Sequence, residues 1–196
     1  MAVRLPNPKY ISKPYEQMGY PDQRVQTDVQ YVPKSCLVGI AAEEGGYYQY
    51  TFLDAYSPFR YLEAFQEHST FSSAQFIRNC VRKFPFAIEC VQTDNGPEFT
   101  NRFSSSATKK LTLFEKTLAQ LGIRHKLIRP YTPRHNGKVE RSHRKDNEEF
   151  YASHSFFSFL DFQRQLTVRR RQYNAFHIRS FNWRSPKQGL SSFPFS

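Results

Sequence analysis

The sequence predicts an α/β fold in which helices pack on a mixed five-stranded sheet. Two observations lead to this prediction. The first third of the chain holds alternating and aromatic runs that favour strands, and the rest alternates between short apolar runs and segments with apolar residues at helical spacing. The expected order is β-β-β-α-β-α-β-α-α, and three meandering strands followed by alternating helices and strands are typical of a mixed sheet with helices packed on it.

Three strands are expected in the first third of the chain. Across 24–32, apolar residues and a threonine alternate with polar residues, which is the two-residue period of a strand, and Asp28 lies on the polar face. The runs 47–53 and 59–65 are aromatic and β-prone. A short segment at 55–58 joins them, so the two runs are predicted to form a hairpin.

A helix and a strand follow the hairpin. Apolar residues at helical spacing predict a helix over 71–84, capped at Ser72 or Thr70 and ended by Pro85. The apolar run 87–91 is then expected to be a short buried strand.

The remaining elements are one strand and three helices. A helix is expected over 113–121, with Gly122 after its end, and a strand over 123–128. Two further helices, at about 137–151 and 155–173, complete the predicted fold. The phenylalanines at the start of the last helix are expected to pack in the core, although a platform for stacking nucleobases is the alternative.

The charge balance indicates a polyanionic partner. The 28 Lys and Arg residues exceed the 17 Asp and Glu residues and give a net charge of +11. The basic residues concentrate in 134–145 and 164–184, which favours a nucleic-acid-binding face. A basic surface that serves only solubility is the alternative.

Cysteine usage and hydropathy limit the cellular setting. The three cysteines, Cys36, Cys80 and Cys90, show no CxxC spacing, which argues against a disulfide scaffold and a zinc site and favours a reducing compartment. No apolar run approaches the roughly 20 residues that span a membrane. We therefore expect a cytoplasmic protein with no membrane partner.

Three carboxylates are placed to hold a metal ion. Asp28 lies on the first strand, Asp94 directly follows the fourth, and Glu140 lies in the first turns of a helix. If the two strands are neighbours, their carboxylates converge at the strand ends, and oxygen ligands of this kind suit Mg²⁺ or Mn²⁺. Spacing alone leaves open the alternative that each acid is a turn former, a cap or a solvated charge.

Longer motifs surround these acids. The run VQTDNGPEF at 91–99 resembles the second-aspartate motif of the DDE integrase core, a family that includes retroviral integrases and bacterial insertion-sequence transposases. PRHNGKVER at 133–141 resembles its glutamate motif, and VQTDVQY at 25–31 resembles its first-aspartate strand. Tyr-Asn at 173–174 and Ser-Pro at 185–186 resemble the end of many bacterial members.

The resemblance covers most of the chain and implies both a fold and an activity. It implies an RNase H-like fold, metal-dependent cleavage of DNA at transposon ends and transfer of the freed 3′-hydroxyl into target DNA. Asp28, Asp94 and Glu140 would be the catalytic metal ligands, at a site for two ions of Mg²⁺ or Mn²⁺. Asp54 also follows a strand, but its setting resembles the hairpin turn of the family, where the aspartate is structural.

The residues expected to contact DNA lie on the last two helices. Some share the helix face of Glu140, where they would meet phosphates of the cleaved strand, and others would follow the backbone of flanking DNA. A helix pair between Arg144 and Glu140 and a solvated basic face are the alternatives. The full set is Asn136, Lys138, Arg141, His143, Arg144, Lys145, Arg169 and Arg170.

The domain prediction separates an extended arm at 1–23, a catalytic core at 24–175 and a tail at 176–196. The tail lacks the Arg-Pro-His that usually follows Tyr-Asn in the family, and a loop at 104–110 is expected to hold an insertion. Family members usually carry a helix-turn-helix domain, for which 1–23 has no room, so a fragment, a truncated gene or a separate reading frame is expected. The protein is expected to form a homo-oligomer on DNA.

Two other functions compete with strand transfer. One is an RNase H-like nuclease, although the Asn-Gly-x-x-Glu motif at 136–140 favours the integrase family. The other is a transposase remnant that only binds DNA, which the intact triad of acids disfavours.

Overall fold

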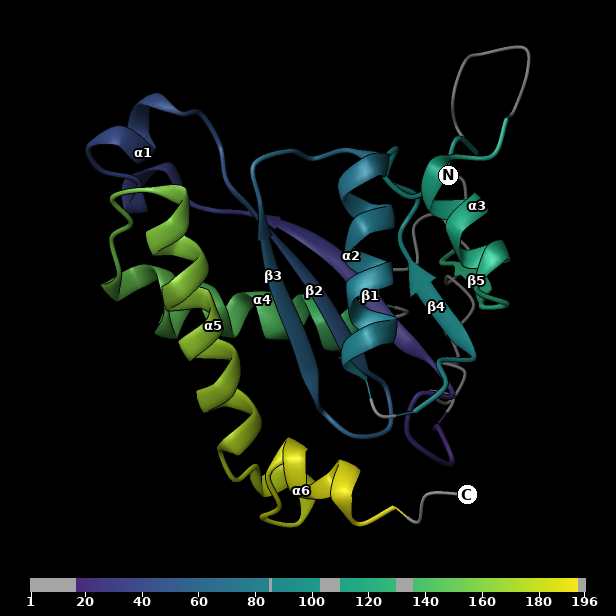
Figure 1. Ribbon diagram of the computed structural model, residues 1–196. Helices are drawn as coiled ribbons and strands as arrows, with labels where there is room; N and C mark the ends of the chain where they lie inside the picture. The colour runs from purple at the N-terminus through teal and green to yellow at the C-terminus, as the bar shows by residue number, and fades with distance from the viewer. Residues whose placement is uncertain (1–16, 85, 103–109, 130–135, 194–196) are drawn as a thin grey trace, which may run out of the picture.

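The computed structural model describes residues 17–84, 86–102, 110–129 and 136–193. A five-stranded sheet lies at the centre of the molecule, with helices on both sides of it (Figure 1). The strands are β1 (Val25–Tyr31), β2 (Tyr48–Asp54), β3 (Arg60–Phe65), β4 (Cys90–Thr93) and β5 (Arg124–Leu127). The α-helices are α1 (Ile40–Glu43), α2 (Thr70–Lys83), α3 (Leu113–Gln120), α4 (Gly137–Glu149), α5 (Phe159–Ala175) and α6 (Pro186–Ser191).

The sheet is mixed, as the sequence predicted. Its strand order is β3-β2-β1-β4-β5. The pairs β1–β2 and β2–β3 are antiparallel, whereas β1–β4 and β4–β5 are parallel. The first and fourth strands are therefore neighbours that run in the same direction, which is the condition for their acids to converge.

Alternation along the central strands gives the sheet two different faces. On one face, Tyr50 and Phe52 of β2 join a buried apolar cluster with Phe76 of α2 and Leu118 of α3. On the other face, Gln49 is fully buried yet polar, and it bonds to the helix α4 behind the sheet (Figure 1). One side of the sheet thus carries a purely apolar cluster, whereas the other combines buried polar groups with a second apolar cluster that joins β3 to α5.

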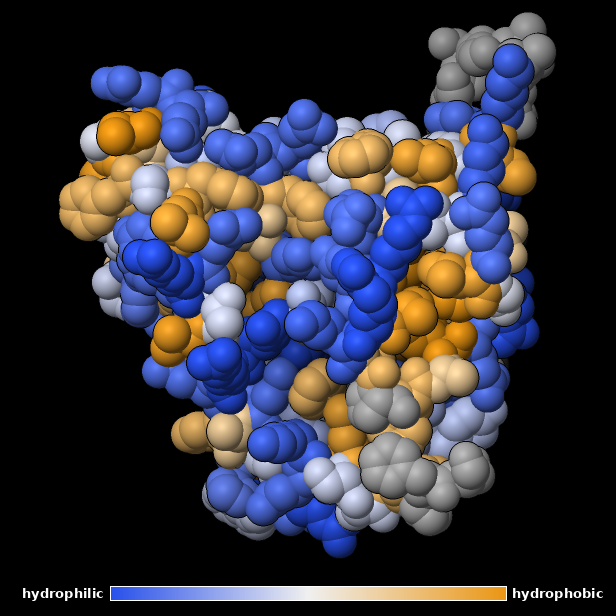
Figure 2. Space-filling view, in the orientation of Figure 1, coloured by the Kyte–Doolittle hydropathy of each residue, from blue (hydrophilic) through white to orange (hydrophobic). Residues whose placement is uncertain are grey.

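The outer surface over α2 is mostly hydrophilic. In the orientation of Figure 1, Figure 2 shows hydrophilic side chains across the middle of this face, with apolar groups exposed beside them. Among the described residues, no helix combines the length and apolar character needed to cross a membrane.

A buried ion pair joins α4 to the sheet. Arg60 of β3 is fully buried and donates two hydrogen bonds to Asp146 of α4, at 2.7 and 2.8 Å. Gln49 donates to the same carboxylate at 2.9 Å, and Arg169 of α5 lies 3.1 Å from its other oxygen. Burial would raise the pKa of Asp146, but Arg60 outweighs burial and the pKa is lowered. This network fixes the helix that carries Glu140.

Element boundaries differ from the predictions where caps and buried polar residues decide them. The helix α2 begins at Thr70 because Ser69, not Ser72 or Thr70, caps it by accepting a hydrogen bond from the Ser72 amide at 3.2 Å. The strand β4 spans 90–93 rather than 87–91, since two polar residues, Gln92 and Thr93, are buried within it.

The phenylalanine-rich stretch before and within α5 divides between the core and the surface. Phe156 and Phe162 are fully buried, as the core-packing prediction required. Phe157 is 64 % exposed, so for this residue the prediction was wrong. The helix α5 begins at Phe159 rather than near 155, because Ser158 accepts a hydrogen bond from the Asp161 amide.

A second buried acid makes stability depend on pH. Asp22 is fully buried, and its carboxyl oxygens have no hydrogen-bond partner among the described residues. Burial, followed by the nearby charge of Asp54, raises the pKa of Asp22 to about 8. The folded state therefore holds a proton more tightly than the unfolded state does.

We expect stability to fall by up to about 5 kcal/mol as the pH rises from 4 to 8, because folding then requires an increasingly unfavourable burial of the Asp22 charge. Asp22→Asn should flatten this dependence and raise the free energy of unfolding at pH 8. Urea denaturation at pH 5 and pH 8 measures both effects. A steep pH dependence that persists in the Asn variant would contradict this account of Asp22.

Candidate active site

The strands β1 and β4 bring Asp28 and Asp94 to the same level of the sheet. Val25 pairs with Val91 in the parallel register, and each aspartate stands three residues beyond its strand's member of that pair. The alternation of β1 places Asp28 on the face that α4 covers, as Gln26 on the same face accepts a hydrogen bond from an α4 amide at 3.1 Å. The predicted convergence of these two acids is therefore observed.

Local backbone bonds orient both carboxylates. The Val29 amide donates to Asp28 at 2.9 Å, and the Gly96 amide donates to Asp94 at 3.0 Å. The Asn95 side chain donates to the Ile128 carbonyl at 3.1 Å and so ties the turn after β4 to the end of β5. The Asp-Asn-Gly run at 94–96 thus shapes the turn and holds the side chain of Asp94, the catalytic candidate, in a fixed orientation.

The two aspartates share a field of negative charge. Burial, and then Asp94, Glu98 and Glu140, raise the pKa of Asp28 to about 7. Burial and Glu98 raise the pKa of Asp94 as well. Carboxylates that are held together without a cation repel one another, and a bound cation would relieve that repulsion.

Glu140 reaches this field from the first turns of α4. The Val139 amide donates to Gln26 of β1 at 3.1 Å, which ties the start of the helix to the strand that bears Asp28. Glu140 itself is exposed and acts on Asp28 through its charge. The structure thus places Glu140 in the electrostatic neighbourhood of Asp28, and its role as a third ligand stays a prediction.

The residues fit a divalent cation. The donors are carboxylate oxygens, which hard cations such as Mg²⁺ prefer, and Glu98 adds a buried oxygen without a hydrogen-bond partner in the described part of the chain. Within the same part of the chain, no three acidic, histidine or cysteine side chains converge closely enough to enclose a metal. The two strands hold Asp28 and Asp94 in place, and we call these two acids the fixed part of the candidate site.

Glu98 is a member of this site that the sequence reasoning missed. It is 6 % exposed, and one of its oxygens lies 3.0 Å from Nε2 of His68. A Cβ on Gly96 would stand 2.5 Å from the Glu98 carboxylate, so glycine is needed there for the acid to fold back. The signal was present, because Glu98 lies inside the motif at 91–99.

His68 is held in place by two aromatic residues. The Tyr31 hydroxyl lies 3.1 Å from Nδ1 of His68, and the ring of Tyr48 stacks on the imidazole at 5.4 Å between centroids. Glu98 is the main cause that raises the pKa of His68. The His68 ring and the Glu98 carboxylate therefore lie together in the field of the two aspartates.

His143 and Asn136 do not lie where a DNA contact was predicted. His143 has Nε2 2.9 Å from the Thr51 hydroxyl and Nδ1 3.6 Å from Asp28, and its side chain is 12 % exposed. Burial lowers the pKa of His143 to about 4, so the ring is neutral near pH 7. Asn136 is 2 % exposed. Helical spacing put both residues on the face of Glu140, but that face is turned partly toward the sheet.

Arg169 and Arg170 are also used within the protein. Arg169 pairs with Asp146 and with Glu149, at 3.1 and 2.8 Å. Arg170 lies over the ring of Tyr61 at 4.4 Å and donates to a backbone carbonyl of β3. Both arginines therefore serve the packing of α5 against α4 and β3, and a DNA contact by either stays a prediction.

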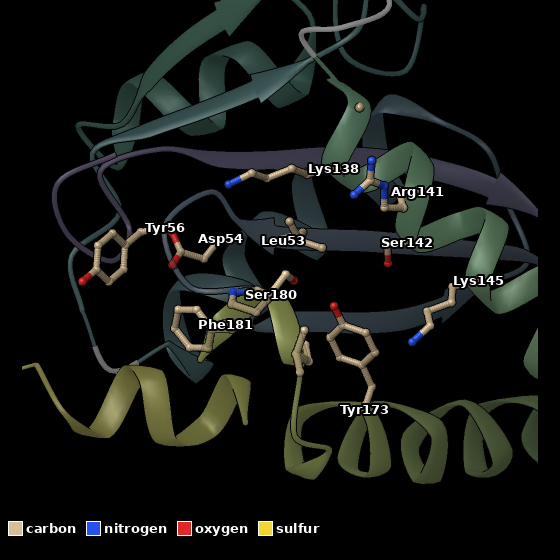
Figure 3. A pocket seen from close by; sticks show the side chains of 13 residues that line it. Leu53, Asp54, Tyr56, Lys138, Arg141, Ser142, Lys145, Tyr173, Ser180 and Phe181 are labelled. Atoms are coloured by element: carbon tan, nitrogen blue, oxygen red, sulfur yellow. The ribbon is translucent and has the colours of Figure 1, made fainter. Parts of the chain in front are cut away.

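The other predicted DNA contacts form an exposed basic row on α4. The row consists of Lys138, Arg141, Arg144 and Lys145, of which Lys138 also donates to the Ala55 carbonyl and Lys145 pairs with Glu149 at 3.4 Å. Three of them, all but Arg144, line a cavity of about 630 Å³ between α4, the end of α5 and the segment after it. Figure 3 shows these three side chains on α4 and, across from them, Tyr173 and Phe181. The cavity combines cations with aromatic rings.

Asp54 has the structural position that was expected. It is fully buried and accepts hydrogen bonds from the amide and the hydroxyl of Ser57, both at 2.7 Å, and from the Asp22 amide at 3.0 Å. These bonds close the turn between β2 and β3.

Comparison with known families agrees with this geometry. Residues 20–133 match the family model described as integrase core domain, and residues 121–190 match a second model of the same description. A protein of Spiroplasma virus SpV1-C74 named "Putative integrase ORF3" is 26 % identical over 153 residues, which cover 74 % of this chain and 42 % of that protein. The "Insertion element IS476 uncharacterized 39.2 kDa protein" of Xanthomonas euvesicatoria is 35 % identical over 107 residues, or 55 % of this chain and 27 % of that one. The chain thus spans less than half the length of these relatives.

Solved structures share the fold. A chain from the structure of the simian T-cell lymphotropic virus intasome in complex with the PP2A regulatory subunit B56 gamma aligns with a TM-score of 0.66 at 16 % identity, over 92 % of this chain and 58 % of that chain. The catalytic core domain of BIV integrase aligns with a TM-score of 0.59 at 18 % identity, over 87 % of this chain and 95 % of that chain. The HTLV-2 integrase catalytic core domain in complex with magnesium, in a trimeric form, aligns with a TM-score of 0.62 at 13 % identity. The alignment covers 87 % of this chain and 97 % of that chain. The RNase H-like fold that the sequence resemblance implied is confirmed.

Proposed function

Because the chain belongs to the integrase core family, we propose that it is the catalytic core of a transposase or integrase that cuts DNA and transfers the freed strand, as in the movement of an insertion sequence. The observation that carries this proposal is that Asp28 and Asp94 lie at matching positions on two neighbouring parallel strands. Each of these acids lies in the field of other carboxylates. Partly buried acids that repel one another at the ends of neighbouring strands have a clear use as metal ligands.

The reaction is two successive exchanges at phosphorus. In the first, a water oxygen bonds to the phosphorus of the DNA strand, the bond from phosphorus to O3′ breaks, and a 3′-hydroxyl is left. In the second, that hydroxyl oxygen attacks a target phosphodiester and displaces the target's own O3′. Each step breaks one phosphorus–oxygen bond and forms one, so no energy source is required.

The residues of the chain divide the work. Asp28, Asp94 and Glu140 would hold Mg²⁺ or Mn²⁺, which supplies an activated nucleophile and neutralises charge on the leaving oxygen. The Val29 amide fixes the orientation of Asp28, and the His143 ring lies 3.6 Å from the same carboxyl group. The basic row on α4 follows Glu140 along the helix and is suited to bind the phosphates that flank the reacting bond.

The partners follow from this chemistry. The substrates are transposon-end DNA and target DNA, in a bacterial cytoplasm and close to the nucleoid. A homo-oligomer assembled on DNA would join two ends, and the recognition of end sequences is assigned to a helix-turn-helix unit outside this chain. Support comes from the partial coverage of the longer relatives and from the oligomeric states that the names of the solved structures state for those proteins.

An assay with two substrates tests the proposal against its nearest rivals. The protein is incubated with Mn²⁺ and either labelled end-bearing DNA or an RNA–DNA hybrid, together with a helix-turn-helix partner where one is encoded nearby. We expect nicked and joined DNA products. Cleavage of the hybrid alone would favour an RNase H-like nuclease, and DNA binding without any processing would favour a remnant that only binds.

The role of Glu140 has a matched control on its own helix. Glu140→Gln should lower strand cleavage about a hundred-fold, because one ligand of a metal that supplies several kcal/mol is lost while two remain. Glu148→Gln changes an exposed acid two turns further along α4 and should leave the rate unchanged. Equal rates for the two variants in the DNA-nicking assay would remove Glu140 from the site.

A further inference from the structure

The segment between α5 and α6, residues 176–185, displays two large aromatic side chains to solvent. We call this segment the C-terminal loop. It contains Trp183, which is the one tryptophan of the chain and is 66 % exposed. Phe176, at the start of the loop, is 67 % exposed. Exposed aromatic residues of this size in a basic protein call for an explanation beyond packing.

The backbone of the loop holds Trp183 outward in a fixed conformation. Asn182 and Trp183 have φ values of 53° and 57°, in the left-handed region that residues with side chains rarely adopt. The Trp183 amide donates to the Ile178 carbonyl at 3.1 Å, and the Ile178 amide donates to the Arg184 carbonyl at 3.1 Å. The position of the indole is thus built into the loop.

The underside of the loop is anchored on α6. Phe181 packs so closely on Gly189 that a Cβ there would lie 2.3 Å from the ring. Phe181 also lines the cavity beside α4 (Figure 3). One aromatic side chain of the loop therefore fixes it to the protein, while Trp183, two residues later, remains at the surface.

The charged side chains of the C-terminal loop are all positive. No acidic residue follows Asp161 in the sequence, and Arg179 and Arg184 are both exposed on the loop. A partner that covers this surface must offer negative charge together with flat apolar groups. Nucleic acid offers both, because every nucleotide pairs a phosphate with an aromatic base.

The loop also adjoins the basic row of α4. Ile178, Ser180 and Phe181 line the same cavity as Lys138 and Arg141, which flank Glu140 on α4. A DNA strand whose phosphates follow that row would pass beside the loop. Bases in an intact duplex expose only their edges in the grooves, whereas an unpaired base exposes its whole face for stacking.

We propose that Trp183 is a binding residue for single-stranded nucleotides that adjoin the reacting DNA, and that its indole stacks on an unpaired base. This inference rests on the proposed function only in taking DNA as the partner. The loop supplies the stacking ring and its arginines, and the row on α4 binds the neighbouring phosphates.

The single tryptophan makes a direct test possible, since the fluorescence that is excited at 295 nm comes from Trp183 alone. A single-stranded oligodeoxynucleotide is titrated in, and its binding is followed in parallel by fluorescence anisotropy of a label on the DNA. We expect saturable quenching of the tryptophan in step with binding. Heparin, a polyanion without bases, should bind the basic row and leave the emission unquenched.

Variants separate stacking from fold effects. Trp183→Ala should weaken binding of the single strand about five- to a hundred-fold, as loss of one base stack does, and Trp183→Phe should restore most of it. Phe157→Ala removes another exposed aromatic residue, just before α5, and should bind as the wild type does. Circular dichroism checks that all three variants are folded.

Binding of the single strand without quenching would overturn the proposal, as would equal affinities for the Trp183→Ala and Phe157→Ala variants. A blue shift of the emission that grows with protein concentration in the absence of DNA would overturn it in favour of self-association. The catalytic proposal is tested separately, because Asp94→Asn should lose strand cleavage and keep the quenching. Cleavage without quenching would reject only the role of Trp183.

Discussion

Replacing Asp94 with asparagine is expected to lower DNA strand cleavage about a thousand-fold, and Asp28→Asn should do the same. Each change removes one negative ligand oxygen from the fixed part of the site while it keeps the size of the side chain. A metal ion contributes several kcal/mol of charge stabilisation in phosphodiester chemistry, and roughly 4 kcal/mol corresponds to a thousand-fold in rate. The measurement is the initial rate of nicking of end-bearing DNA in Mn²⁺.

Two controls make this result interpretable. Asp161→Asn changes a partly exposed aspartate at the start of α5, far along the chain from the strand ends, and should leave the rate unchanged. Binding of DNA by the Asp94→Asn variant should persist, since the basic row is untouched. A variant that cuts at the wild-type rate would show that Asp94 is only a turn former beside Asn95.

Replacing Asp146 with alanine is expected to cost about 3–5 kcal/mol of folding free energy, the range for breaking a buried ion pair by removing one partner. Arg60 would be left fully buried, and it would lose the two bonds at 2.7 and 2.8 Å that now satisfy its charge. The Gln49 amide would lose one of its two acceptors as well and keep only the Thr51 hydroxyl. Urea denaturation of the wild type and the variant measures the difference.

Glu148→Ala is the matched control for this change, because it removes an exposed acid from the same helix. It should shift the free energy of unfolding by less than about 0.5 kcal/mol. Since α4 also carries Glu140, Asp146→Ala should lower activity before it unfolds the protein. A variant as stable as the wild type would mean that the network with Arg60 does not hold α4 to the sheet.

The sheet and the two aspartates could be predicted because local signals and topology agree. Alternation along 24–32 placed Asp28 on one face, and the end of the fourth strand placed Asp94. Once β1 and β4 are neighbours and parallel, no further information is needed to bring the two acids together. The family motifs then distinguished these acids from Asp54.

The surroundings of the acids could not be predicted in the same way. Helical spacing groups His143 with Glu140, but it does not say how far that face turns toward the sheet, and His143 lies against Thr51. Likewise, a run of arginines gives no sign that Asp146 and Glu149 lie across from Arg169. Such contacts join residues far apart in the chain, and only the packed structure contains them.

Short elements were missed for a different reason. The helix α6 has a complete capping box, in which Ser185 and Gln188 bond to each other's backbone amides, with Pro186 in the first turn. The sequence carries this signal, but a helix of six residues shows too little apolar periodicity to be detected.

Binding of Mn²⁺ tests the central claim most directly, since it does not require the correct DNA ends or a partner subunit. The free ion is followed by electron paramagnetic resonance as protein is added, for the wild type and for the Asp28→Asn/Asp94→Asn double variant. We predict that the wild type binds Mn²⁺ saturably, and that the double variant, still folded by circular dichroism, does not. Equal binding by the two proteins would contradict the assignment of these acids as the metal centre.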